Sequence, residues 1–304
     1  MSAPMRSTDF RSIVEPILNE CFDGVYDQRA DEWSRVFREE DGIPRTYHEE
    51  AVLYGFGAAP QLPDGTPVTY QQGGVLFLKR YLYKQYGLAF ALTKVLVEDG
   101  DHIRIGQVYA RHLAQSLVET KELLCANVLN TAFNSAYPGG DGVSLINTAH
   151  PIVTGTFSNQ LTTAAVLSQT SLEQMLIQIR QAVDNNGKRI RLVPRQLVIA
   201  PGNLFQAEVL LKSVLRTGNA NNDINPIKSI GLLDEGAAVL SRLTSSTAWW
   251  VQTDAMEGFK LMMRRRLEKT MEGDFGTDSM RYKATERYDV GFTDPRCAFG
   301  TPGM

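Results

Sequence analysis

The sequence predicts a mixed α+β protein, and three segments carry that prediction. Residues 101–135 place apolar side chains on one helical stripe with neither glycine nor proline between Gly106 and its end, which predicts one long helix. Residues 280–292 alternate apolar and polar side chains, which is typical of a strand with one buried face. Residues 171–211 join two amphipathic helical patterns through a short apolar run, which indicates an α/β unit.

The composition is that of a globular protein. Of 304 residues, 43% are hydrophobic and 21% are charged, which is enough apolar material for a core. There are 31 lysines and arginines against 34 aspartates and glutamates, so the formal net charge is −3, which argues against a polycationic nucleic-acid binder. The widely spaced Cys21, Cys125 and Cys297 argue against a disulfide framework or a zinc site. No apolar run reaches the roughly 18 residues that would predict a membrane span.

Residues 1–46 are predicted to form an arm with two short helices. Apolar residues recur every three or four positions between residues 10 and 25, as in an amphipathic helix. Pro16 is expected to kink this helix or to place a helix start nearby, and the helix is expected to break near Gly24. A second short helical pattern follows at residues 33–37.

Residues 47–97 are predicted to form a long β-hairpin that extends from the body. The segment is rich in aromatic residues, which favour strands, and Pro63-Asp64-Gly65 is a turn signal between two extended runs. Because exposed aromatic strands aggregate unless a neighbour covers them, the hairpin is a candidate subunit interface. We therefore expect Tyr81→Asp to spare the fold and to block assembly. Six of its aromatic residues fall within residues 70–90, and they are Tyr70, Phe77, Tyr81, Tyr83, Tyr86 and Phe90.

No motif in the sequence predicts catalysis or metal binding. The histidines at positions 48, 102, 112 and 150 form no close ligand pair, and no serine or cysteine lies in a recognised nucleophile motif. Residues 139–142 lack the Lys-Ser/Thr of a phosphate-binding loop and are expected to form a plain turn. We predict neither enzymatic activity nor a cofactor.

The C-terminal region contains two strand patterns and the one basic triplet of the chain. Residues 259–264 alternate in the same way as residues 280–292, and we expect these two strands to pair. Strand alternation divides Arg264, Arg265 and Arg266 between two faces. Cross-strand ion pairs on a solvated strand are the main interpretation, and an electrostatic subunit contact is the alternative.

The order of these elements resembles that of the major capsid proteins of tailed bacteriophages, most of all the Mu-like major head subunit group. The resemblance spans nearly the whole chain, from the arm through the hairpin and the long helix to the final strand. Its motifs are LLCANVLNTAF at the end of the long helix, NTAHP after a glycine-rich turn, QLVIAPGNLFQAEVLL in the α/β unit and YKATERYDVGFTDPRCAFG near the C-terminus.

The resemblance implies four structural parts. They are an N-terminal arm (1–46), an extended hairpin loop that lies over an adjacent subunit (47–97), a peripheral domain with a spine helix (98–164 and 256–304) and an axial domain at the five-fold and six-fold centres (165–255). It also implies either a processed chain or a separate scaffold, and it makes Lys79 and Lys84 candidates for a cross-link to a neighbour. The candidate assembly-interface residues are Tyr70, Phe77, Lys79, Tyr81, Tyr83, Asn219, Asn221, Asn222, Arg264 and Arg266.

The function that the resemblance implies is that of a major capsid protein, which self-assembles as hexamers and pentamers into an icosahedral shell. The shell would enclose phage double-stranded DNA without sequence-specific binding, would be assembled in the host bacterial cytoplasm, and would involve no membrane. Scaffolding, portal and cement proteins are the implied partners. The alternatives are an encapsulin-type nanocompartment shell, a tail or connector component, and an α/β enzyme in which His150 or Asp141 is essential.

Overall fold

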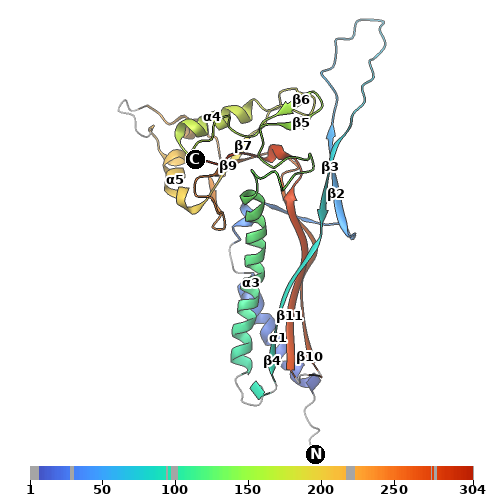
Figure 1. The fold of residues 1–304 in the computed structure, drawn as a ribbon, viewed down its shortest axis with the longest axis vertical. Helices are drawn as coiled ribbons and strands as arrows, with labels where there is room; N and C mark the ends of the chain where they lie inside the picture. The colour runs from blue at the N-terminus through green and yellow to red at the C-terminus, as the bar shows by residue number, and fades with distance from the viewer. Residues whose placement is uncertain are drawn as a thin grey trace, which may run out of the picture.

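The computed structural model is a long stalk with a head at one end and a hairpin that projects past the head (Figure 1). It describes residues 7–27, 31–93, 95–96, 102–216, 223–274, 276 and 279–303, with side chains from Val14 onward. Helices and sheets both contribute to the stalk and to the head, so the α+β prediction is confirmed.

The stalk consists of two helices packed on a four-stranded sheet. The strand order is β1-β10-β11-β4, with β1 parallel to β10 and the other neighbours antiparallel. The predicted pairing of the two C-terminal strands is confirmed, because β10 pairs with β11 along its length. The elements are α1 (Ser7–Tyr26), η1 (Trp33–Arg35), β1 (Arg38–Asp41), β4 (Lys84–Thr93), α3 (His102–Asn130), β10 (Phe259–Asp274) and β11 (Ser279–Phe292).

Helix α1 continues through Pro16 and ends at Tyr26, two residues after Gly24, so the predicted end near Gly24 is confirmed and no helix starts at Pro16. Val14, Leu18 and Phe22 are no more than 1% exposed, in one cluster with residues of α3, β10 and β11. Full burial of such side chains contributes about 1.5–3 kcal/mol each. Together these contributions offset the roughly 3 kcal/mol that a proline costs inside a helix.

Helix α3 confirms the predicted long helix, although it ends before residue 135. Leu113 is buried as the predicted stripe requires, whereas Tyr109 is 46% exposed. One line of contact with α1 runs along small residues, and a Cβ added to Gly106 would lie only 3.1 Å from Leu18. Because small residues allow the two helices to approach, the buried face keeps Leu113 and Leu117 of the predicted stripe and extends beside it to Gly106, Ala110 and Ala114.

The projecting hairpin is shorter than the sequence predicts. Strand β4, expected in the hairpin, pairs with β11 in the stalk sheet. The rings of Tyr86 and Tyr288 lie 4.7 Å apart between centroids, and those of Phe90 and Tyr282 lie 5.4 Å apart, so the aromatic residues of β4 belong to the stalk core. The hairpin itself consists of β2 (Tyr47–Tyr54), the hairpin loop of residues 55–73 and β3 (Gly74–Leu82), with β2 and β3 antiparallel.

The head contains the predicted α/β unit. Its sheet has the strand order β12-β9-β7-β8, and each face has its own core. Trp249 lies in the core covered by the head helices, whereas Trp250 lies in the core that continues into the stalk. The elements are α4 (Gln169–Arg180), β7 (Pro194–Ile199), η2 (Pro201–Asn203), α5 (Leu204–Lys212), α6 (Pro226–Ile230), β8 (Ala237–Val239) and β9 (Trp249–Thr253).

Two segments of the head differ from the sequence-based prediction. The end of the chain, expected in the peripheral domain, returns through η3 (Pro295–Cys297) and adds β12 (Ala298–Thr301) to the head sheet beside β9. The polar region after the long helix is not wholly irregular, because β5 (His150–Ile152) and β6 (Gly155–Phe157) form a short hairpin within it.

Candidate assembly interface

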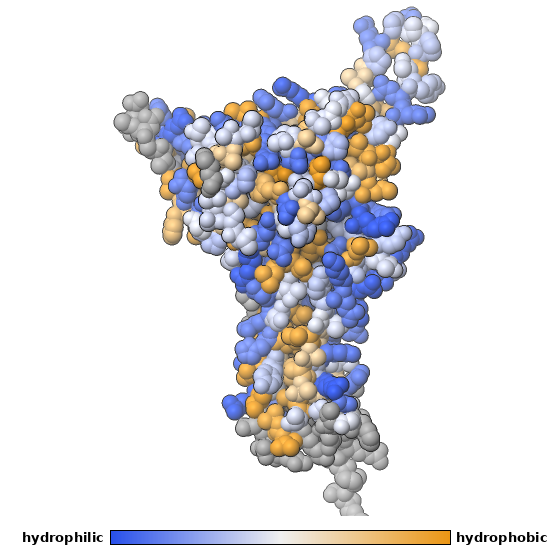
Figure 2. All heavy atoms as spheres, in the orientation of Figure 1, coloured by the Kyte–Doolittle hydropathy of each residue, from blue (hydrophilic) through white to orange (hydrophobic). Residues whose placement is uncertain are grey.

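The hairpin loop stands clear of the rest of the subunit (Figures 1 and 2). Leu62, Val68 and Tyr70 are 54%, 64% and 95% exposed. Apolar side chains gathered on a projecting segment are typical of a protein contact site. Among the hairpin residues predicted to form an interface, Tyr70 therefore has the geometry that a contact with a neighbour needs.

Tyr81 and Tyr83 lie at the base of the hairpin and face the interior of the subunit. Tyr81 is fully buried, and its hydroxyl forms a hydrogen bond of 2.6 Å with Thr293. Tyr83 is 6% exposed and shares a small cluster with Tyr81 and Met262. Burial also raises the pKa of the Tyr81 hydroxyl. Because Tyr81→Asp would place a carboxylate in this cluster, the expectation that it spares the fold is wrong.

Phe77 and Lys79 are half-buried and hold the hairpin against the body. A Cβ added to Gly140 would lie 2.8 Å from the Phe77 ring, so this ring packs on the turn after the spine helix. The Lys79 ammonium lies 5.2 Å from the centre of the Phe292 ring, and burial lowers the pKa of Lys79 in spite of nearby carboxylates. A role for either residue between subunits stays a prediction.

An ion cluster around the buried Lys260 ammonium joins the base of the hairpin to the stalk. The Lys260 ammonium lies 2.7 Å from Glu50 and 3.3 Å from Glu40, and it also pairs with Glu257. Thr293 donates a further hydrogen bond to Glu50. Burial of the Glu50 carboxyl opposes its ionisation, but the bonds from Lys260 and Thr293 outweigh burial and lower the pKa of Glu50. The cluster therefore ties β2 to β10.

We expect Glu50→Gln to reduce the acid sensitivity of the subunit. Because folding lowers the pKa of Glu50, its contribution to stability is complete above the ordinary glutamate pKa of about 4.3 and is lost as the pH falls through the folded value. The free energy of unfolding, measured in urea over the acid range, should fall more steeply for the wild type than for Glu50→Gln. Glu49→Gln, at a surface pair with Arg80, should keep the wild-type slope. Parallel profiles for wild type and Glu50→Gln would contradict this assignment.

His150 and Asp141 form a buried structural hub rather than an open cleft. His150 is fully buried, with Nδ1 2.6 Å from Asp141 Oδ2 and Nε2 3.1 Å from Asn159 Oδ1. The two N–H groups of the Asn159 amide are shared among three main-chain carbonyl oxygens, those of Leu145, Pro295 and Ala298, which lie 2.7, 3.0 and 3.0 Å from the amide nitrogen. These bonds join the loop after the spine helix to the end of the chain, and the buried side chains leave no face for a substrate.

Within the basic triplet, Arg266 forms the cross-strand ion pairs that the main interpretation predicts, whereas Arg265 pairs with Glu268 on its own strand. Arg266 on β10 lies 3.1 Å from Glu39 and 3.1 Å from Asp41, both on the neighbouring strand β1. Arg264 donates to a main-chain carbonyl at 3.3 Å. The Arg266 side chain remains 70% exposed, so its contact with another subunit stays a prediction alongside that of Arg264.

The head presents a second apolar surface, formed by its outer helices. Ile177 on α4 and Ile230 on α6 flank a groove and are 57% and 68% exposed, and Phe205 on α5 is 81% exposed. The predicted interface residues Asn219, Asn221 and Asn222 lie outside the described residues, between Arg216 and Asp223. This surface has no counterpart in the interface residues predicted from the sequence.

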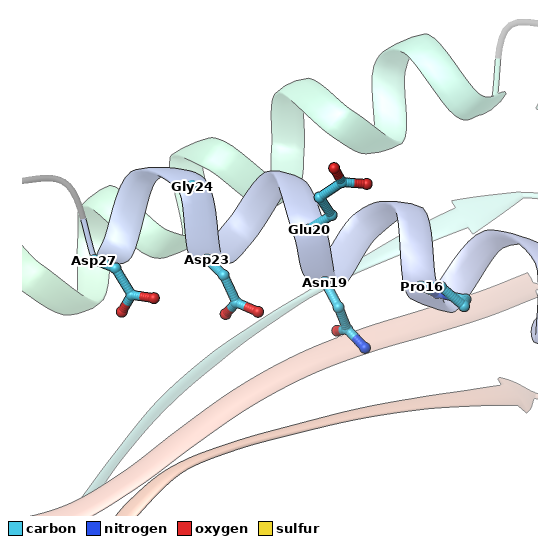
Figure 3. Close-up of a pocket in the computed structure, with 6 residues that line it drawn as sticks. All are labelled: Pro16, Asn19, Glu20, Asp23, Gly24 and Asp27. Atoms are coloured by element: carbon cyan, nitrogen blue, oxygen red, sulfur yellow. The ribbon is translucent and has the colours of Figure 1, made fainter.

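A third surface is an acidic side of α1 that borders the stalk sheet (Figure 3). Pro16, Asn19, Glu20, Asp23 and Asp27 are spread along one helix instead of converging on a point. Asn19 accepts a hydrogen bond from the Tyr282 hydroxyl at 2.7 Å, and Asp23 pairs with Lys269 at 2.5 Å. Asn19 and Asp23 therefore hold α1 to the sheet, and the polar side chains along this helix do not enclose a ligand.

The described residues contain no group of three or more histidine, cysteine, aspartate or glutamate side chains placed to hold a metal ion. Within the same ranges, no helix has both the length and the apolar character needed to cross a membrane. Cys125 and Cys297 are buried free thiols, and Cys21 is a partly exposed one.

The comparison with protein families decides the identity of this fold. Residues 81–300 match the family model described as phage capsid protein. The chain belongs to the phage capsid protein family. Its role is accordingly structural and not enzymatic, and the buried hub around His150 agrees with that role.

Solved capsid structures share the fold of this capsid protein. The capsid of the cyanophage P-SCSP1u aligns with a TM-score of 0.58 and 11% identity, covering 91% of this chain and 89% of that one. The procapsid of bacteriophage JBD30 aligns with 0.53 and 14%, covering 97% and 76%. The virus-like particle from Pyrococcus furiosus aligns with 0.52 and 10%, covering 94% and 98%. No curated protein matches the sequence. The predicted tailed-phage capsid fold is confirmed.

Proposed function

We propose that this capsid protein is the major head subunit of a tailed bacteriophage. In this proposal its copies form hexamers and pentamers, which close into an icosahedral shell around double-stranded DNA. The observation that carries the proposal is the family match over residues 81–300. The exposed apolar surfaces on the hairpin loop and on the outer helices of the head support it, because each needs a neighbour to cover it.

Shell formation would depend on geometry and not on bond chemistry. Helix α3 has 29 residues, which at about 1.5 Å per residue makes a rod on the order of 40 Å long. Packed against α1 and the stalk sheet, it keeps the head and the opposite end of the stalk at a fixed separation. Contacts that are weak singly can then add through symmetry into a closed shell.

The charge of the subunit supports enclosure of DNA without specific binding. The formal net charge is −3, and the basic triplet is engaged in part by acidic residues of its own subunit. A strongly basic wall would retain DNA through phosphate contacts. A nearly neutral wall leaves the packaged DNA free to move.

The finer assignments follow from the sequence resemblance. We propose that the subunit belongs to the Mu-like major head group, that residues 165–255 act as the axial domain, and that residues 47–82 reach over an adjacent subunit. Scaffolding, portal and cement proteins are the proposed partners. Assembly is proposed to take place in the host bacterial cytoplasm before the shell becomes part of the virion.

Negative-stain imaging of the purified protein, alone and co-expressed with its neighbouring genes, tests this function. We expect shells, rings or tubes. A monodisperse monomer under all salt and protein concentrations would contradict the proposal. Rings with a single rotational axis would instead identify a tail or connector component.

An encapsulin-type compartment is the second candidate. This chain aligns over 94% of its length with the virus-like particle from Pyrococcus furiosus. The fold alone does not distinguish the shell of a phage head from the shell of a compartment, so both functions are tested. The contents of shells purified from the native source distinguish them. Double-stranded DNA supports the head subunit, and an enzyme cargo supports the compartment.

A further inference from the structure

The projecting hairpin is held to the body at two levels. At its base, the buried Tyr81 and the ion cluster around Lys260 fix it to the stalk. Further out, where β2 ends and the hairpin loop begins, its contacts come from the head. Residues 184–188 form a tight turn after α4 at this point, and we call this segment the clamp turn.

The clamp turn binds the hairpin through three hydrogen bonds that lie close together along the chain. Each joins a side-chain nitrogen of the turn to a main-chain carbonyl oxygen of the hairpin: Asn185 to Leu53 (3.1 Å), Asn186 to Gly55 (2.8 Å) and Lys188 to Phe56 (2.6 Å). The hydrogen bond from the Lys188 ammonium to Phe56 has a charged donor, and such bonds are stronger than those from the neutral amides of Asn185 and Asn186. Because all the acceptors are backbone atoms, the clamp turn holds the path of the chain whatever side chains the loop carries.

The clamp turn is itself held rigidly. Asp184 Oδ1 accepts hydrogen bonds of 2.8 Å from the main-chain nitrogens of both Asn186 and Lys188. The main-chain oxygen of Asn185 accepts a bond of 3.0 Å from Val153, in the turn between β5 and β6. Donors that are fixed by their own supporting bonds can hold a partner in one geometry.

The hairpin loop beyond these contacts has little support of its own. Its internal bonds include one from Gly57 to the Gln71 side chain at 2.7 Å and one from Thr66 to Pro63 at 3.2 Å. A two-stranded ribbon is only marginally stable in isolation. The direction of the loop is therefore decided where it leaves the head.

We propose that the clamp turn is a positioning site that sets the direction in which the hairpin loop projects, so that the loop meets a neighbouring copy at the angle a closed shell requires. The second half of this proposal rests on the proposed shell function, whereas the first half concerns the single subunit. Asn186 and Lys188 carry the test, because their side chains lie outside the cores.

The first measurement is a distance distribution within one chain. Spin labels on Asp64→Cys at the loop tip and Gln115→Cys on α3 are measured by pulsed electron resonance in a Cys21→Ser background, diluted with unlabelled protein. Loss of two contacts in Asn186→Ala/Lys188→Ala should make the distribution roughly twofold broader at unchanged melting temperature. Replacing Lys188 by arginine instead of alanine keeps a charged donor at this position. The distance distribution should then be narrower than that of the double alanine variant. An unchanged width in the double variant would overturn the proposal.

The matched control is Asn203→Ala/Lys212→Ala, which removes an asparagine contact with Ser246 and a surface pair with Glu208 elsewhere in the head. It should leave the distribution narrow.

The second measurement is the yield of closed shells, which should fall for the clamp variant and not for the control. Normal yield from the clamp variant would overturn the assembly half. Absence of shells from the wild type would refute the proposed function, while the distance measurement would still decide the positioning role.

Discussion

Removal of residues 58–70, with a Gly-Gly link between Gly57 and Gln71, is expected to leave a folded subunit that forms no shells. The removed segment contains Leu62, Val68 and Tyr70, all more than half exposed. The ends to be joined are close, because the Gly57 nitrogen lies 2.7 Å from the Gln71 side-chain oxygen. The base of the hairpin and the clamp turn contacts are untouched by the deletion.

The expected loss of assembly has a simple physical reason. Each exposed apolar side chain contributes about 1.5–3 kcal/mol when a neighbour covers it fully, and this contribution is repeated at every copy in the shell. The stability of the isolated subunit should change little, since these side chains are not part of its cores. Thermal unfolding measures the first effect, and negative-stain particle counts measure the second.

Point variants make the same test at a single side chain. Tyr70→Asp should reduce the number of shells strongly, because it places a charge where an apolar ring is to be buried. Tyr70→Phe keeps the ring and should assemble nearly as the wild type does. Shells formed at wild-type yield by both the deletion and Tyr70→Asp would show that the hairpin loop is not an interface.

Asn159→Ala is expected to lower the free energy of unfolding by on the order of 3–5 kcal/mol. The Asn159 side chain is fully buried, shares its two amide N–H groups among three main-chain carbonyl oxygens and accepts a 2.8 Å bond from the main-chain nitrogen of Asn147. Its removal leaves several buried polar groups without partners, and each such group costs about 1–3 kcal/mol. His150 loses the partner of its Nε2 as well.

Asn203→Ala is the matched control for this change. The Asn203 amide makes one exposed hydrogen bond of 2.9 Å to Ser246, so its loss should cost about 1 kcal/mol or less. Chemical denaturation of the soluble subunit compares the two variants directly. Equal stabilities for Asn159→Ala and Asn203→Ala would show that the hub does not hold the end of the chain in place.

Local pattern was enough to predict the main elements. The apolar stripe of residues 101–135 predicted α3, and alternation predicted the β10–β11 pair. The ordered set of motifs also indicates the phage capsid family, which the match over residues 81–300 confirms. Periodicity succeeds here because the burial of a side chain within one element depends mainly on neighbours close in sequence.

Sequence reasoning failed where a contact joins distant segments. The aromatic residues of 47–97 look alike in sequence, yet Tyr70 is exposed, Tyr81 is buried and Phe90 lies in the stalk. A signal for the hub was present in the NTAHP motif, but no local rule shows that His150 will meet Asp141 and Asn159 inside the protein.

The sequence alone therefore determined the element types, the family and the existence of a projecting aromatic hairpin. Only the tertiary structure decided that β4 leaves that hairpin, that β12 closes the head sheet, and that residues 184–188 hold the hairpin by its backbone. The physical reason is that strand partners and main-chain hydrogen bonds carry no side-chain signature of their own. They are settled by which distant surfaces can be buried together once the whole chain has folded.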